Sequence, residues 1–105
     1  MNKEHLMNNP ALFAYETSKY FVRPERLLKH YTCSNEIVIL STKRLYIYFF
    51  TTFIDVYDEL LTKLDLTETK SGCKVVIRGK EFDLEFKTDD EFRSFISYYN
   101  EFKLG

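Results

Sequence analysis

The sequence is poor in the residues that many specialised sites and scaffolds require. Its 105 residues include three glycines, two prolines, two cysteines and no tryptophan. The glycines stand apart at positions 72, 79 and 105, which excludes a glycine-rich loop of the kind that cradles phosphates. Two cysteines cannot build a disulfide scaffold. The longest uncharged apolar run, residues 45–54, includes two threonines and is about half as long as a membrane-spanning helix.

An excess of charge of one sign is also missing. The formal net charge is −1, so we expect no general attraction to nucleic acid or to an anionic membrane. Apolar residues make up 45% of the chain and charged residues 30%, which is typical of a soluble globular domain with one core. Residues 1–7 carry charged side chains and no apolar stretch, so no secretion signal is visible and we expect a cytoplasmic protein.

The cysteines and histidines do not form a metal-binding or catalytic pattern. A zinc site needs about four closely spaced ligands, whereas Cys33, Cys73, His5 and His30 include no C-x-x-C pair. His30 and Cys33 are three residues apart, which places them on opposite faces of a strand. We therefore expect reduced, buried thiols, no metal, no cofactor and no enzymatic activity.

Acidic residues gather in two places, and structure explains both. Asp89, Asp90 and Glu91 follow Thr88 in a capping-box pattern that predicts a helix start. Asp55, Asp58 and Glu59 fit the solvated end of a strand.

The remaining pattern predicts a helix, a run of strands and a second helix. Asn9 and Pro10 suit the start of a helix over residues 10–21. Apolar side chains at helical spacing after residue 91 predict an amphipathic C-terminal helix. Alternating or β-rich segments predict strands at 26–32, 36–41, 44–51, 53–57, 61–69, 74–78 and 81–87, with a turn at 71–72 and a hairpin loop at 79–80.

This order resembles the pleckstrin-homology (PH) superfold, and local segments resemble its bacterial PH-like domain family. The segment LSTKRLYI (40–47) is similar to the family's strand–Thr–Lys–Arg–Leu–strand hairpin, and residues 61–66, 74–77 and 82–86 are similar to its second half. The resemblance covers residues 25–103. It implies an α+β fold: a curved antiparallel sheet or partly open barrel of six or seven strands, capped by the C-terminal helix. Residues 1–24 add an N-terminal arm and helix to the PH-like domain at 25–105, within a single domain overall.

The same resemblance implies binding rather than catalysis. Phosphoinositide binders of the PH fold resemble one another in a basic loop between the first two strands. Here that loop, residues 33–36, contains no Lys or Arg. The resemblance therefore leaves protein binding as the expected use.

The strand at 44–51 is apolar on both faces. Leu45, Ile47 and Phe49 can fill a core, while the opposite face carries Tyr46, Tyr48 and Phe50, joined by Val38 and Leu40 if the strands pair. The helix at 10–21 could cover this aromatic face through Leu12, Phe13 and Tyr20. Alternatively the face could dock a partner or a second copy, or a one-residue slip could exchange the two faces.

Five basic residues could form a patch if the fold brings them together: Arg23, Arg26, Lys29, Lys43 and Arg44. Such a patch would contact phosphates or anionic lipid, unless it is simply a solvated face. Stacking of bases on Tyr46 and Tyr48 is disfavoured by the low net charge.

The sequence thus predicts a non-enzymatic binding module. We expect it to dock a protein partner, or a second copy, through the aromatic face (Tyr46, Tyr48, Phe50 and Leu40) or through a strand edge. The composition also suits a bacterial or phage accessory protein, such as an inhibitor of one host protein. The alternative is a membrane-surface or phospholipid-binding adaptor that uses the basic patch.

Overall fold

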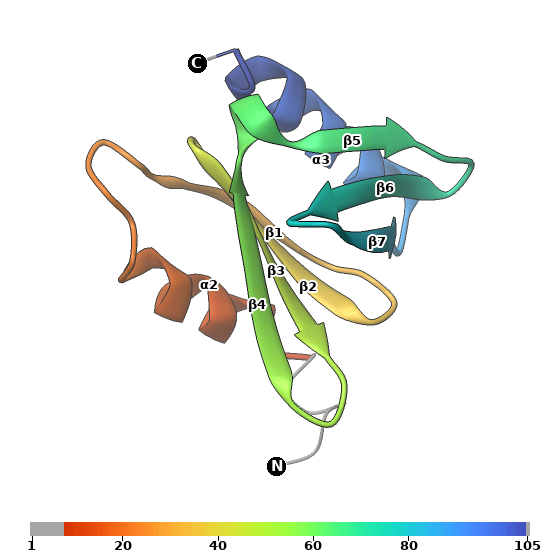
Figure 1. Cartoon of the computed structure of the whole chain (residues 1–105), viewed down its shortest axis with the longest axis horizontal. Helices are drawn as coiled ribbons and strands as arrows, with labels where there is room; N and C mark the ends of the chain where they lie inside the picture. The colour runs from red at the N-terminus through yellow and green to blue at the C-terminus, as the bar shows by residue number, and fades with distance from the viewer. Residues whose placement is uncertain (1–7, 105) are drawn as a thin grey trace.

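The computed structural model describes residues 8–104, which form two α-helices, a short 3-10 helix and seven strands (Figure 1). In chain order the elements are α2 (Pro10–Ser18), β1 (Leu27–Thr32), β2 (Glu36–Ser41), β3 (Arg44–Phe50), β4 (Ile54–Leu60), η1 (Leu61–Lys63), β5 (Asp65–Glu68), β6 (Gly72–Ile77), β7 (Lys80–Glu85) and α3 (Asp89–Phe102).

The strands make two antiparallel sheets, each in simple chain order. The first has the order β1-β2-β3-β4 and the second the order β5-β6-β7. The sheets are not closed into a barrel; within residues 8–104 an isolated bridge from Cys33 to Phe86 joins the end of β1 to the end of β7. Seven strands, a C-terminal helix and an added N-terminal helix confirm the predicted PH-like α+β architecture.

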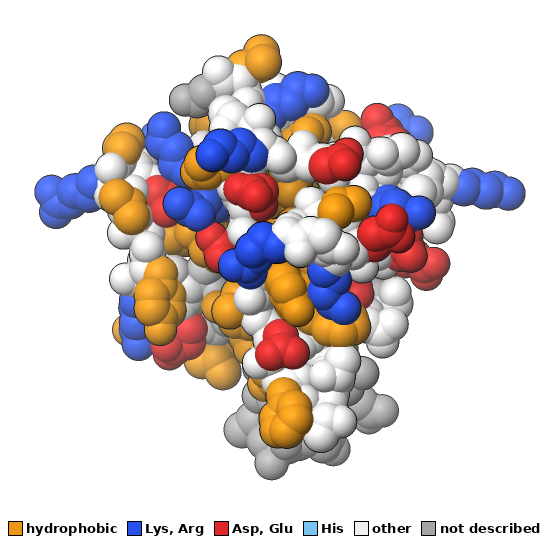
Figure 2. Space-filling view, viewed as in Figure 1, with side chains coloured by type: hydrophobic (Ala, Val, Ile, Leu, Met, Phe, Trp, Pro, Cys, Tyr) orange, Lys and Arg blue, Asp and Glu red, His pale blue; other side chains and the backbone are white. Residues whose placement is uncertain are grey.

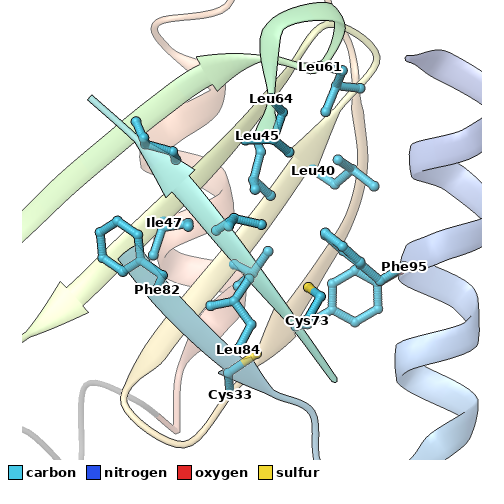
Figure 3. Packing of buried hydrophobic residues seen from close by; sticks show 14 residues of the cluster. Cys33, Leu40, Leu45, Ile47, Leu61, Leu64, Cys73, Phe82, Leu84 and Phe95 are labelled. Carbon is cyan, nitrogen blue, oxygen red and sulfur yellow. The ribbon is translucent and has the colours of Figure 1, made fainter. Parts of the chain in front are cut away.

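The main core lies between the two sheets and is closed by α3. Leu45 and Ile47 of β3 face Leu84 and Phe82 of β7 across it, and Phe95 of α3 is fully buried at its side (Figure 3). The Tyr31 hydroxyl lies 2.8 Å from the Ser94 hydroxyl and so ties β1 to α3. The predicted helix cap is confirmed, since Thr88 Oγ1 accepts a hydrogen bond from the Glu91 amide at 3.1 Å.

Strand β2 is buried along its whole length because both faces of the first sheet are covered. Val38 and Leu40 pair with Ile47 and Leu45, so all four side chains point into the main core. The prediction that Val38 and Leu40 join the aromatic face is therefore wrong. Residues paired across strands share a face, and the tight turn pairs Leu40 directly with Leu45. Figure 3 shows Leu40 beside Leu45 in the core.

Residues 61–69 do not form the single strand that was predicted. Leu61 and Leu64 are both buried in the main core, and a spacing of three would put them on opposite faces of a strand. A 3-10 turn places such residues on one side, and η1 does so before β5 begins at Asp65. Helix α2 is also shorter than predicted, because residues 19–21 continue it only with hydrogen bonds three residues back.

Gly72 and Gly79 occupy other places in the second sheet than predicted. The hairpin loop is Arg78-Gly79, both with positive φ (51° and 81°), and Lys80 already pairs with Ile77. These dihedrals suit the right-handed twist of a two-residue hairpin. Gly72 was expected in a turn but starts β6, opposite Glu85. A Cβ atom there would overlap the carbonyl oxygen of Leu84.

We expect Gly72→Ala to lower the free energy of unfolding by about 2–4 kcal/mol, because the added methyl group must displace strand β7. Urea denaturation measures this. Gly79→Asn is the matched control, because Asn tolerates the left-handed conformation and open space surrounds that position. Equal stability of Gly72→Ala and wild type would contradict the close approach of β6 and β7.

Candidate functional site

Helix α2 covers much of the aromatic face of the first sheet. The Phe13 ring lies 5.0 Å from the Tyr48 ring and 5.5 Å from the Phe50 ring, between centroids. Tyr46 and Phe50 are buried beneath this cover. The prediction that Phe13 packs here is confirmed, whereas Leu12 and Tyr20 are exposed to solvent.

Two polar connections hold the N-terminal segment to the sheet. The Thr17 hydroxyl donates to the Phe13 carbonyl oxygen and lies 2.6 Å from the Tyr48 hydroxyl. The buried Glu25 carboxyl accepts three hydrogen bonds, from Ser41 Oγ (2.5 Å), the Tyr46 hydroxyl (2.8 Å) and the Val22 amide (3.1 Å). Burial, and then the hydrogen bond to Glu25, raises the pKa of the Tyr46 hydroxyl, which therefore stays a donor.

A groove remains where α2 does not reach. It has a volume of about 480 Å³ and runs between the end of α2 and strand β4. Its floor is formed by Tyr46 and Tyr48, and their β4 partners Asp58 and Val56 line its outer side. We call it the α2–β4 groove; its other lining residues are Glu16, Thr17, Tyr20, Val22 and Arg44.

The side chains at the mouth of the α2–β4 groove are apolar and open to solvent. Tyr20 is 76% exposed, Val22 71% and Val56 50%. Neither Tyr20, Val22 nor Val56 was predicted as a site residue. The sequence carries only a weak signal for them, since an exposed Val or Tyr looks the same as a core one until the packing is known.

The charges around the groove pair with one another. Arg44 Nη1 lies 2.7 Å from Asp58 Oδ2, and Lys19 Nζ lies 3.3 Å from Glu16 Oε2. Arg44, predicted for the basic patch, is thus engaged by an acid. The groove therefore has an apolar floor and a rim whose positive and negative charges pair with one another. It does not offer a site for a small ion.

Three of the five predicted basic residues meet elsewhere. Arg23, Arg26 and Lys43 line a hollow of about 700 Å³ with Phe102 of α3, while Lys29 and Arg44 do not. The hollow is held in shape because Arg26 N donates to Thr42 Oγ1 (3.0 Å) and Thr42 N donates to the Arg26 carbonyl oxygen (2.8 Å). None of its three basic side chains joins an ion pair within residues 8–104. On the face that Figure 2 shows, basic and acidic side chains are interspersed.

Both cysteines are buried thiols of the main core. Burial raises the pKa of Cys73 to about 12 and raises that of Cys33 further. Both are therefore protonated, and neither is a nucleophile, at neutral pH. Among the described residues no three His, Cys, Asp or Glu side chains are grouped so as to hold a metal ion. Within the same range, no helix has the length and apolar character needed to cross a membrane.

Neither a scan against protein-family models nor a search of curated proteins finds a match to this chain. Two solved structures are similar. One is a pleckstrin homology domain from Shewanella amazonensis SB2B, with a TM-score of 0.63 and 16% identity. The other is a DUF1696 family protein with a pleckstrin-homology domain from Shewanella loihica PV-4, with a TM-score of 0.63 and 17% identity. Each match covers 90% of this chain and 97% of the other.

The chain has a PH-like fold. At such identities the likeness concerns the fold alone, and the fold is one that hosts many functions. The structural likeness agrees with the resemblance that the sequence shows over residues 25–103.

We expect both thiols to resist a thiol reagent such as Ellman's reagent in the native protein and to react fully in denaturant. Their raised pKa values also affect stability. The stabilisation from the buried neutral thiols is complete below about pH 9, where unfolded thiols are protonated as well. It is lost as the pH rises from 9 toward 12, because only the unfolded thiols ionise there.

Urea denaturation between pH 7 and pH 10.5 measures this loss of stability. Cys73→Ala is the control, since it should flatten part of the alkaline decline. Rapid labelling of either cysteine in the native protein would contradict the buried positions.

Proposed function

We propose that this protein is a non-enzymatic binding module that docks a protein partner through the α2–β4 groove and the adjoining strand β4. The observation that carries the proposal is the cluster of exposed Tyr20, Val22 and Val56 around an apolar floor. Exposed Tyr and aliphatic side chains gathered at a concave site are typical of interfaces.

The proposal uses part of the predicted aromatic face. Tyr46 and Tyr48 contribute as the groove floor, and Phe50 supports them under α2. Leu40 has no part, because its side chain lies in the main core. A second copy of the chain is the competing occupant of the same site. A cytoplasmic accessory or inhibitor role in a bacterium or phage stays a prediction.

Val56→Glu tests the proposal, because burying a carboxylate under a bound partner is costly and should weaken partner binding at least about tenfold. Tagged wild type and variant are used to capture proteins from host lysate, and each captured protein is then purified and titrated. Leu27→Glu is the matched control, an exposed aliphatic residue on the opposite edge strand β1. A partner held equally by Val56→Glu and wild type would refute docking at the groove.

A second candidate function is contact with anionic phosphates at the hollow lined by Arg23, Arg26 and Lys43. Three basic side chains that join no ion pair within residues 8–104 favour it; they come from two segments that the Arg26–Thr42 hydrogen bonds hold together. The buried Glu25 carboxyl, which also lines the hollow, opposes it. The carbonyl groups at the C-terminal end of α3 oppose it too.

Arg26→Glu with Lys43→Glu should abolish binding to phosphatidylserine vesicles if this hollow is the contact, and wild-type binding should weaken steeply with salt. Sedimentation with vesicles of phosphatidylserine and of phosphatidylcholine measures both effects. Lys70→Glu with Lys87→Glu is the charge-matched control, because neither residue lines the hollow. Equal sedimentation with both lipids would count against this candidate.

A further inference from the structure

Strand β4 is the open edge of the first sheet, and its first half is exposed. Among residues 8–104 it pairs only with β3, in an unbroken register from Arg44–Leu60 to Phe50–Ile54. Ile54, Asp55 and Val56 are all exposed. Figure 1 shows the β3–β4 hairpin reaching away from the second sheet. An edge strand directs every second N–H and C=O group outward, where they lack a partner strand. In β4 the Leu60 amide donates instead to Glu59 Oε1 at 2.8 Å.

The other sheet edges carry more devices that discourage pairing than β4, whose charged residues are Asp55, Asp58 and Glu59. Strand β1 has a register shift between Leu27 and Lys29 and is bridged at its end through Cys33. Strand β5 has four residues, and β7 is dominated by charged side chains. Strand β4 has no bulge, no proline and no basic residue. A seven-residue, partly apolar edge with an unbroken register is suited to receiving another strand.

We infer that an extended peptide with alternating apolar and basic side chains adds to β4 as a fifth strand of the first sheet. This inference rests on the proposed function and specifies the partner of the same site. Side chains of an added strand alternate between the two faces of the sheet, so each face of β4 selects its own residue type.

The outer face of β4 selects apolar residues. Ile54 and Val56 pair with Phe50 and Tyr48, so they share the face of the α2–β4 groove. Apolar side chains of an added strand would lie beside them, next to exposed Tyr20 and Val22.

The inner face of β4 selects basic residues. Asp55 and Glu59 point to this face, four residues apart, and neither joins an ion pair within residues 8–104. Glu59 Oε1 accepts a hydrogen bond from the Leu60 amide (2.8 Å). Between them Tyr57 already has Arg78 above its ring, 5.4 Å from the centroid. Basic partner residues are therefore expected opposite Asp55 and Glu59, with an uncharged residue between them.

Two synthetic peptides with blocked ends test the inference against the full chain. Lys-Thr-Val-Val-Lys-Ile places its lysines opposite Glu59 and Asp55 in an antiparallel register, and Glu-Thr-Val-Val-Glu-Ile is the matched control. NMR titration should place the largest shifts on β4, slow the exchange of alternate β4 amides, and show the lysine peptide binding about fivefold more tightly. Asp55→Lys with Glu59→Lys should invert this preference.

If the double reversal does not fold, Asp55→Asn with Glu59→Gln should remove the preference instead. Equal binding of the two peptides, no binding at millimolar concentration, or shifts away from β4 would overturn strand addition. A concentration-dependent dimer in light scattering that Val56→Glu abolishes would assign the edge to a second copy and also overturn it. Partner capture that Val56→Glu abolishes but that substitutions of Asp55 and Glu59 leave unchanged would support docking at the groove and refute only the addition of a strand.

Discussion

The fold depends on one sheet that must be buried on both faces. Strand β2 exposes none of its side chains, and β3 alternates Leu45 and Ile47 with Tyr46 and Tyr48. Apolar side chains on both faces require a covering layer on each, because exposed apolar area is costly. The second sheet and α3 supply one layer, and α2 supplies the other. The N-terminal helix α2 is in this sense as necessary as the core.

The outer layer is incomplete, and its attachment explains why a groove remains. Helix α2 has nine residues and buries only Phe13, Ala14 and Thr17. The segment after it is held by the Glu25 carboxyl, which takes donors from β2, β3 and its own loop. A buried carboxyl with three donors is satisfied without a basic partner. The hydrogen bonds of Glu25 hold the segment after α2 at one end of the aromatic face, so the side formed by β3 and β4 stays open.

Several errors of sequence interpretation share a physical cause. Leu61 and Leu64 suited an alternating strand but are buried together through a 3-10 turn. Gly72 suggested a turn but lies in β6, where strand β7 approaches too closely for a side chain. Leu40 seemed to join Tyr46 and Tyr48, yet its register with Leu45 turns it inward. In each case the deciding contact comes from a segment far away or from the register of a neighbouring strand.

Local chemistry in the sequence determined the element order, the capped C-terminal helix, the buried inert cysteines and the two-sided apolar strand. These follow from side-chain periodicity, capping and turn residues, which act over a few positions. The tertiary structure alone decided which three basic residues meet, that Arg44 pairs with Asp58, and that Tyr20, Val22 and Val56 surround one groove. Those neighbours lie up to 36 residues apart, between Tyr20 and Val56. The packing of the N-terminal segment on the sheet and the pairing of β3 with β4 set their distances.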